Sequence, residues 1–354
     1  MDGARRTLVG GIAAAWLAPR WLWRAAALAG APAGSLAEPP GRTERIHRVG
    51  FMSREMPYPA CGKKIAEVLR THGFELGRNL EIRCVFLDNR ETDTGFLAKK
   101  AKELIALNPD VIITLSNEPA GALGDETASI PIVFLAGGSA DRVPEATKGR
   151  TLARSWSRPG GNMTGVVVPY QELALKRLEL VRELLPKARR IALLANYPHL
   201  RTRIPGFPAE LEAGARNLGM NILEADASKD RGDIAATFSR VIRRNPDAFF
   251  VFGEVNFQPD RVEVIEAMEL RRRIPVIFDI QGSGILALSP DWQLAMDRAY
   301  QNAAKVLKGT KPADIPLEME NRYLMTVNLL RAAAIGLEVP RSLVLRADRV
   351  IDGK

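Results

Sequence analysis

Short apolar runs alternate with amphipathic stretches along most of the chain from residue 46 onward. Runs of about four to eight apolar residues are typical of strands that are buried on both faces of a parallel sheet. The intervening stretches carry apolar side chains at helical spacing, for example Leu97, Ala101 and Leu104. This alternation is the βαβ pattern of parallel sheets covered by helices. Strands are predicted at residues 48–52, 80–87, 111–115, 132–135, 165–168, 191–195, 221–225, 248–252 and 276–279.

The pattern occurs twice, which predicts two lobes of the same kind. Asn-Pro-Asp stands directly before a predicted strand at residues 108–110 and again at residues 245–247. Ile-Pro followed by three apolar residues occurs downstream of each, at residues 130–134 and 274–278. The shared order predicts an α/β chain of two similar, doubly wound parallel-sheet lobes joined by a hinge. Lobe 1 is expected at residues 46–160 plus about 285–322, and lobe 2 at residues 163–284 plus about 323–354.

The segment between these two lobes is rich in turn residues. Residues 158–162 read Arg-Pro-Gly-Gly-Asn, and a proline with two glycines forms a turn that can absorb backbone change. We predict the hinge here, with an ordinary loop as the alternative. Beyond residue 284 the pattern predicts a helix at about 292–307, a strand at 325–329 and a helix at 330–335, which are expected to cross back between the lobes.

Candidate ligand-binding residues of the first half follow its strands, because open parallel sheets bind ligands at the carboxyl ends of their strands. Ser116 and Asn117 stand at the start of a predicted helix, whose free N–H groups suit a carboxylate or another anion. The alternative is a cap that satisfies only its own helix. After the next strand, Gly138 allows a ligand to approach the backbone, and Ser139 and Asp141 offer a hydroxyl and a carboxylate.

The second half has candidates at the corresponding places. Asn196 and Tyr197 follow one predicted strand, Glu254 follows the next, and Asp279 ends a third. Tyr170 and Tyr197 also offer rings that can stack on a flat ligand, although ordinary packing is the alternative for each tyrosine. We therefore expect one ligand site between the lobes, with residues from both.

The remaining composition restricts the chemistry. A chain of 354 residues with 46% apolar and 26% charged residues is typical of a folded protein of about two domains. Two cysteines and three histidines without ligand spacing argue against a metal site, and no cofactor motif is present. No nucleophile motif or catalytic triad can be named, so an enzyme is not expected; Asp141, Glu254 and Asp279 could supply paired carboxylates, but so could any three acidic residues of a chain this long. Cys61 and Cys84 are either a disulfide or two buried thiols.

The first residues and the net charge point to export rather than to nucleic acid. Residues 1–37 hold Arg5 and Arg6, apolar runs and the small-residue pattern Ser-Leu-Ala at 35–37, which predicts an export signal cut before residue 38; an uncleaved anchor or a wrongly assigned start is the alternative. Without these residues, which hold four arginines and one aspartate, the net charge falls from +9 to +6. The three arginines at 271–273 are interpreted as a solvated helix end, and nucleic-acid binding is not expected.

Several motifs together resemble a known family. Their sequences are Arg-Pro-Gly-Gly-Asn-Met-Thr-Gly-Val at 158–166, Lys-Arg-Leu-Glu-Leu at 176–180, Leu-Lys-Gly-Thr-Lys-Pro-Ala-Asp-Ile-Pro at 307–316 and Arg-Ala-Asp at 346–348. With Ile-Pro-Ile-Val-Phe at 130–134, they make the chain from residue 46 to 352 similar to the periplasmic substrate-binding proteins of ABC transporters, in the family that includes tryptophan- and tyrosine-binding members.

The resemblance implies a type I periplasmic-binding fold with three crossovers between the lobes. It also implies a monomer in the periplasm that traps a small solute, such as an amino acid, as the lobes close, and delivers it to an ABC permease. Carried over by position, it adds Ser53 to the candidate site and supports Ser116, Asn117, Gly138, Ser139, Asp141 and Asn196. Leu288 stands where the family often has tyrosine, so an aromatic ligand is not implied. The alternatives are a periplasmic ligand-sensing protein that feeds a signalling partner and, less favoured, an enzyme that uses the cleft.

Overall fold

The computed structural model describes residues 45–54, 62–87, 94–138, 143–146, 150–203, 206–227, 234–252, 259–279 and 283–353. Glu44–Lys354 form one compact unit. The predicted export signal at residues 1–37 lies outside the described residues. Among the residues that are described, no helix has the length and apolar character needed to cross a membrane.

Within the described residues, the first sheet consists of β1 (His47–Arg54), β2 (Leu80–Leu87), β3 (Val111–Leu115), β4 (Ile132–Gly138), β5 (Met163–Pro169) and β11 (Glu318–Met319). The strands are parallel, in the order β11-β5-β4-β3-β1-β2. The helices that cover this sheet are α1 (Lys63–Arg70), α2 (Thr94–Ile105), α3 (Asn117–Glu126) and α9 (Trp292–Leu307), and a short 3-10 turn, η2 (Pro312–Asp314), follows α9. Val111 and Ile113 of β3 pack with α1 and α9, whereas Ile112 packs with α2 and α3, so both faces of the apolar run are buried.

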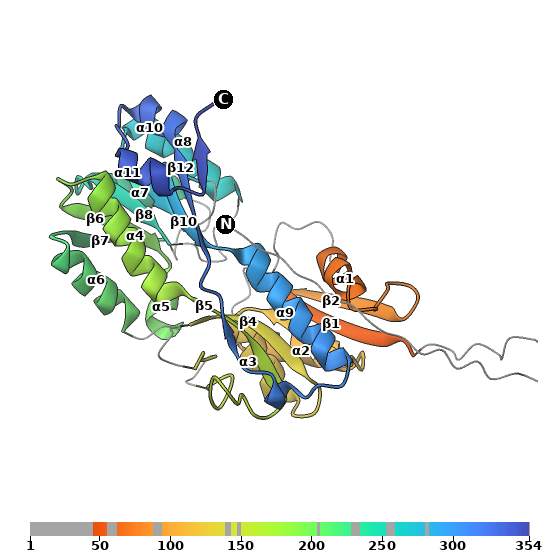
Figure 1. The fold of residues 1–354 in the computed structure, drawn as a ribbon. Helices are drawn as coiled ribbons and strands as arrows, with labels where there is room; N and C mark the ends of the chain where they lie inside the picture. The colour runs from red at the N-terminus through yellow and green to blue at the C-terminus, as the bar shows by residue number, and fades with distance from the viewer. Residues whose placement is uncertain are drawn as a thin grey trace, which may run out of the picture. The chain divides into compact units, whose positions relative to one another are not determined.

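The second sheet has seven strands among the described residues, in the order β13-β12-β10-β9-β8-β6-β7. They are β6 (Arg190–Ala195), β7 (Asn221–Asp226), β8 (Ala248–Val251), β9 (Val276–Phe278), β10 (Leu286–Pro290), β12 (Tyr323–Asn328) and β13 (Arg349–Ile351). The pair β10 and β12 is antiparallel. One face packs against α4 (Tyr170–Leu184), α5 (Tyr197–Arg203), α6 (Phe207–Asn217), α10 (Leu329–Ile335) and α11 (Arg341–Arg346), and the other against α7 (Ile234–Ile242) and α8 (Pro259–Arg272). Figure 1 shows α4 and α6 side by side, and α9 along the first sheet.

The sequence repeat is also a structural repeat. The asparagines of both Asn-Pro-Asp motifs have a positive φ, 50° in the first lobe and 49° in the second, which directs the chain back into the sheet. Asp110 donates its backbone N–H to Arg48 O at 2.8 Å, and its Oδ2 accepts the Arg48 N–H at 2.8 Å. Asp247 makes the same two bonds with Arg190, each at 2.8 Å. The predicted fold class of two similar parallel-sheet lobes is confirmed.

Two of the predicted lobe boundaries are wrong. Strand β5 pairs with β4, so the first lobe continues past residue 160 to Pro169. Strand β10 pairs with β9, so the second lobe continues past residue 284 to Pro290. The hinge prediction at residues 158–162 is wrong for the same reason, because this segment joins two strands of one sheet. The Asn162 side-chain amide holds it there by donating to Thr127 O and Ile130 O at 3.0 and 2.7 Å.

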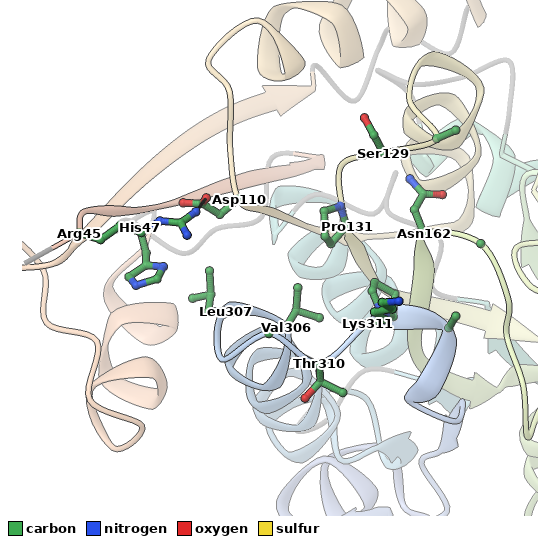
Figure 2. Close-up of a pocket in the computed structure, with 15 residues that line it drawn as sticks. Arg45, His47, Asp110, Ser129, Pro131, Asn162, Val306, Leu307, Thr310 and Lys311 are labelled. Atoms are coloured by element: carbon green, nitrogen blue, oxygen red, sulfur yellow. Dashed lines mark hydrogen bonds and ion pairs between the residues drawn. The ribbon is translucent and has the colours of Figure 1, made fainter.

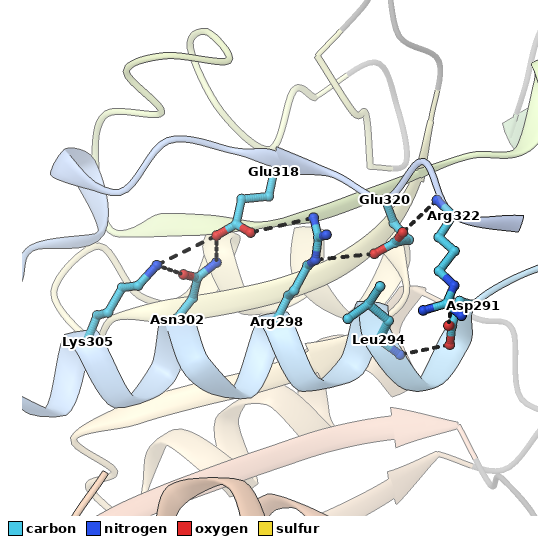
Figure 3. A network of polar contacts seen from close by, with 8 residues as sticks. All are labelled: Asp291, Leu294, Arg298, Asn302, Lys305, Glu318, Glu320 and Arg322. Atoms are coloured by element: carbon cyan, nitrogen blue, oxygen red, sulfur yellow. Dashed lines mark hydrogen bonds and ion pairs between the residues drawn. The ribbon is translucent and has the colours of Figure 1, made fainter. Parts of the chain in front are cut away.

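The chain passes between the sheets three times instead, and the three crossovers are bonded to one another. They lie between β5 and α4, between β10 and α9, and between β11 and β12. The Glu320 N–H donates to Val167 O of β5 at 2.9 Å, and the Asp291 N–H donates to Arg322 O at 2.9 Å. Charged side chains reinforce these contacts, as Figure 3 shows for Asp291, Glu320 and Arg322. These crossovers, and not the glycine-rich turn, connect the lobes.

Candidate functional site

Tyr170 lies where the two sheets and a crossover meet. It begins α4 directly after β5, and its ring covers Gly137 at the carboxyl end of β4; a Cβ atom built on Gly137 would lie 2.8 Å from Tyr170 Cδ2. The same ring lies 6.3 Å from the Phe252 ring, which follows β8, and 5.6 Å from the Trp292 ring at the start of α9. Tyr170 therefore joins the strand ends of both lobes, which is where a sheet of this type binds ligands.

A buried carboxylate and a buried guanidinium lie beside this ring. Asp279 directly follows β9 and is 4% exposed. Arg177 is fully buried on α4, donates from Nε to Leu288 O at 2.7 Å and lies over the Phe250 ring. Its Nη1 and Nη2 have no hydrogen-bond partner. A cation, a carboxylate and a phenol thus share a region of low dielectric, where charge interactions are strong.

The pKa shifts in this group follow from burial and from the neighbouring charges. Burial raises the pKa of the Tyr170 hydroxyl, and the Asp279 carboxylate raises it further, while Arg177 opposes both. Burial lowers the pKa of Arg177, and Asp279 and Tyr170 oppose that shift. Tyr170 is therefore a neutral phenol at physiological pH, able to donate a hydrogen bond to a ligand.

The first lobe contributes the start of α3. Ser116 has φ 141°, a conformation that side chains other than glycine rarely adopt, and such strain is concentrated at functional sites. Its hydroxyl makes no capping bond to α3, so the capping alternative is not realised. Asn117 has a structural task, since its Nδ2 donates to Gly137 O and Glu145 O and its Oδ1 accepts from Gly137 N, each at 2.8 Å. It fixes the glycine segment that lies under Tyr170.

The other predicted site residues are distributed as follows. Ser53 is buried one residue before the end of β1, and Gly138 ends β4. Asn196 is half-buried between β6 and α5, and its carbonyl accepts from Leu200 N at 3.0 Å. Tyr197 lies inside the hydrophobic core of the second lobe, which fits the packing alternative. Ser139, Asp141 and Glu254 lie outside the described residues, as does Cys61; Cys84 is disulfide-bonded.

Sequence reasoning missed Arg177, Phe252 and Trp292. Arg177 left a signal, because it follows Tyr170 by seven residues and takes an apolar position of the helical period, where a charge is unexpected. Phe252 and Trp292 resemble ordinary core residues in the sequence, and only the crossovers bring them to Tyr170.

Neither a metal site nor the pocket of Figure 2 offers a better candidate. Among the described residues, no group of three or more His, Cys, Asp or Glu side chains could hold a metal ion. The pocket in Figure 2 has a volume of about 420 Å³ and lies at the amino edge of the first sheet, the edge opposite Tyr170. Two of its charged side chains are paired with each other, since Arg45 Nη2 lies 2.5 Å from Asp110 Oδ1.

Comparisons with known proteins decide the family. The family model described as ABC transporter substrate binding protein matches residues 60–351. The chain belongs to this family. A tyrosine-binding protein of Clostridioides difficile (strain R20291) is 26% identical over 270 residues, which are 75% of this chain and 73% of that protein. Residues 60–351, which the family model matches, include strands of both lobes and all three crossovers.

Solved structures give the fold. A conserved domain protein from Vibrio cholerae O1 biovar El Tor has a TM-score of 0.71 at 22% identity, covering 86% of this chain and 100% of that one. The ABC domain from Streptococcus pneumonia in complex with L-Trp has a TM-score of 0.70 at 21% identity, with the same coverage. The fold of this family member is therefore the type I periplasmic-binding fold, as the sequence motifs imply.

Proposed function

We propose that the chain captures a small zwitterionic solute, an amino acid or a close relative, between its lobes and delivers it to an ABC permease. The observation that carries this proposal is the meeting of Asp279, Arg177 and Tyr170 at the strand ends of lobe 2, directly beside the α3 start of lobe 1. A carboxylate on one lobe and helix N–H groups on the other complement an amine and a carboxylate on the same small molecule.

The proposed capture follows from this division of contacts. The solute amine binds Asp279, its carboxylate binds at Ser116 and the first N–H groups of α3, and the Tyr170 ring lies between them. Each lobe alone supplies half of the contacts, so the solute binds the closed form better than the open form and shifts the population towards closure. The Arg177 guanidinium balances the buried charge of Asp279.

The relatives support the same class of solute. One is named a tyrosine-binding protein, and one solved neighbour holds L-Trp. The extracytoplasmic location that the proposal requires is supported by the sequence of residues 1–37, and the amino terminus of the protein recovered from an extracytoplasmic fraction would test it.

The proposal is tested by thermal unfolding of the purified protein with the common amino acids, short peptides, nucleosides and sugars. A ligand at a hundred times its Kd adds about 2.7 kcal/mol of stability. With an unfolding entropy of about 2.1 cal/mol/K per residue over ~310 residues, this raises Tm by about 4 °C. We expect amino acids to raise Tm and sugars to leave it unchanged.

Two variants of equal charge identify the site. Asp279→Asn should weaken amino-acid binding by at least tenfold, because the solute amine loses its counter-charge, about 1.4 kcal/mol or more. Asp314→Asn removes an exposed carboxylate from η2 and should leave affinity unchanged. Equal affinity of the Asp279→Asn variant and the unmodified chain would refute the assigned site, and a response to sugars alone would refute the solute class.

A further inference from the structure

The amino edge of the second sheet gathers basic side chains from segments that are far apart in the sequence. Strands β9, β8 and β6 are neighbours and parallel, so their amino ends meet at one edge. Arg271, Arg272 and Arg273 precede β9, and Arg243 and Arg244 precede β8. Lys187 and Arg189 precede β6, which begins with Arg190. All eight side chains are exposed, and we call this surface the basic edge.

The basic edge carries little compensating negative charge. In the segments 186–190, 243–248 and 270–276 the only acidic residue is Asp247. Its Oδ2 accepts the backbone N–H groups of Arg189 and Arg190 at 2.7 and 2.8 Å. Among the described residues, none of the basic-edge side chains makes an ion pair with an acidic side chain. Two carboxylates of α8 also lie at this edge, where Glu269 accepts the Val276 N–H and Glu266 accepts the Gly284 N–H, but both are paired with Arg331.

The first lobe provides an internal comparison, because it has the same frame without the charge. There the strands β4, β3 and β1 occupy the matching places, and residues 106–110 and 127–131 hold no basic residue. Arg45 pairs with Asp110 at 2.5 Å, as Figure 2 shows, and Arg48 Nε lies 3.7 Å from a Glu81 carboxylate oxygen. The turns and helix ends of this fold therefore form without a basic cluster, so the basic edge is not a requirement of folding.

The chemistry of the basic edge fits phosphate groups on an apolar surface. Seven of the eight side chains are arginines, whose planar guanidinium binds phosphate in two-pronged fashion. Two exposed leucines lie along the same edge: Leu270, 41% exposed, precedes the three arginines, and Leu330, 50% exposed, follows the end of β12. Asn328 places that strand end here by donating its N–H to Ile285 O at 2.8 Å. Basic residues with interspersed apolar side chains are typical of proteins that bind membrane surfaces.

We propose that the basic edge binds the surface of an anionic phospholipid bilayer. Lobe 2 would then rest on the membrane by the edge opposite its strand carboxyl ends, which leaves the candidate solute site free. This inference goes beyond solute capture and does not depend on it. A nucleic acid fits less well, because no exposed aromatic side chain lies among the described residues of this edge to stack on bases.

Vesicle co-sedimentation of residues 44–354 tests the proposal. This part forms one compact unit and omits the apolar leader, which would bind lipid by itself. We expect binding to vesicles of phosphatidylcholine with phosphatidylglycerol, no binding to phosphatidylcholine alone, and release by salt, since exposed charges are screened over about 8 Å at physiological ionic strength.

A pair of matched triple variants locates the surface. Lys187→Gln, Arg243→Gln and Arg272→Gln together remove one cation from each segment of the basic edge. Each cation near an anionic membrane strengthens vesicle binding by about fivefold. The partition coefficient of this triple variant between vesicles and solution should therefore be roughly a hundredfold below that of the unmodified chain. The control removes three exposed cations of the first lobe with Arg83→Gln, Lys99→Gln and Lys308→Gln, and should bind vesicles as the unmodified chain does.

The outcomes separate the sources of binding. A loss confined to the basic-edge variant, with its solute-dependent rise in Tm unchanged, supports the proposal. Equal losses in both triple variants would show attraction by net charge and would overturn it. Failure of the unmodified chain to bind anionic vesicles would also overturn the proposal. If the chain bound soluble polyglutamate or heparin but not vesicles, the partner would be an acidic macromolecule and not a membrane.

Discussion

Glu320 connects the three crossovers, and neutralising it is the sharpest test of how the lobes are joined. Its side chain is 1% exposed. Its Oε1 accepts from Arg322 N at 2.7 Å, and its Oε2 lies 3.4 Å from Arg298 Nε on α9 (Figure 3). Glu318, two residues earlier, lies on the same segment and contacts the same helix, but its side chain is 32% exposed. The pair Glu320→Gln and Glu318→Gln therefore compares a buried with a partly exposed carboxylate.

The expected cost follows from these contacts. The amide of Glu320→Gln can still accept one bond from Arg322 N, but that bond loses its charge assistance, worth about 1 kcal/mol. The second oxygen or nitrogen of the amide faces Arg298 either as a donor or as a neutral acceptor. The Arg298 side chain, which is 35% exposed, thereby loses its nearer carboxylate, for about 1 kcal/mol more. The total of about 2 kcal/mol corresponds to a fall in Tm of about 3 °C over the ~310 residues of the compact unit. Glu318→Gln should cost under about 1 kcal/mol, since solvent screens its ion pairs.

Thermal unfolding followed by far-UV circular dichroism measures both variants under one condition. Added salt should reduce the Tm difference between Glu318→Gln and the unmodified chain. It should hardly alter the corresponding difference for Glu320→Gln, because interactions of a buried carboxylate are screened less. If both variants had the Tm of the unmodified chain, Glu320 would contribute nothing to the junction. If Glu318→Gln were the more destabilised variant, the burial argument would be refuted.

Three further changes test other parts of the structure. Reduction of the disulfide at Cys84, whose only possible partner in the sequence is Cys61, should lower stability by about 3 kcal/mol on the chain-entropy model, as the fall in Tm with a reductant will show. Gly137→Ala should displace the Tyr170 ring, 2.8 Å from the new Cβ, and weaken solute binding at least tenfold in calorimetry. Burial raises the pKa of Glu269 against the lowering effects of Arg331 and the Val276 N–H, so the stability that its protonated form contributes is present at low pH and is lost as pH rises. We therefore expect the free energy of unfolding of the unmodified chain, measured in urea, to fall relative to that of Glu269→Gln from about pH 4.5 upward. A difference between the two free energies that does not depend on pH would contradict this.

The elements of this fold can be predicted from the sequence better than their assignment to lobes. Every strand predicted from an apolar run is present, because such runs need burial on both faces wherever they pair. The partner of a strand is a different matter. The run in β5 has the same signal as that in β6, but β5 pairs with β4, where the missing Cβ of Gly165 makes room for Phe134; a Cβ there would lie 2.1 Å from Phe134 O. This contact between Gly165 and Phe134 joins residues about thirty positions apart, so it produces no periodic pattern in the sequence from which the pairing could be predicted.

In the candidate site, too, some residues can be identified from the sequence and others cannot. Asp279 could be named because polar residues at strand carboxyl ends are few and their place is fixed by the parallel sheet, and Tyr170 because its ring could stack on a flat ligand. Asn117 could be named too, but its role could not, since its amide bonds depend on the path of the backbone at Gly137 and Glu145. Arg177 lies on the buried face of a helix, where the helical period favours an apolar side chain. A charge at such a position is the kind of conflict that marks function, and the amino-acid sequence alone displays it.

The internal repeat separates what the fold requires from what was added to it. Both lobes turn into their sheets through an asparagine of positive φ and an aspartate that bonds the neighbouring strand, so these features belong to the frame. A feature present in one lobe and absent from the other cannot be required by that frame. The basic edge of lobe 2 and the buried carboxylate of Asp279 are both of this kind, because Leu135 of β4 stands at the place in the shared Ile-Pro motif that Asp279 has in lobe 2. Both features place charge where burial or repulsion disfavours it, a cost in stability that folding alone does not explain and that binding a charged partner would offset.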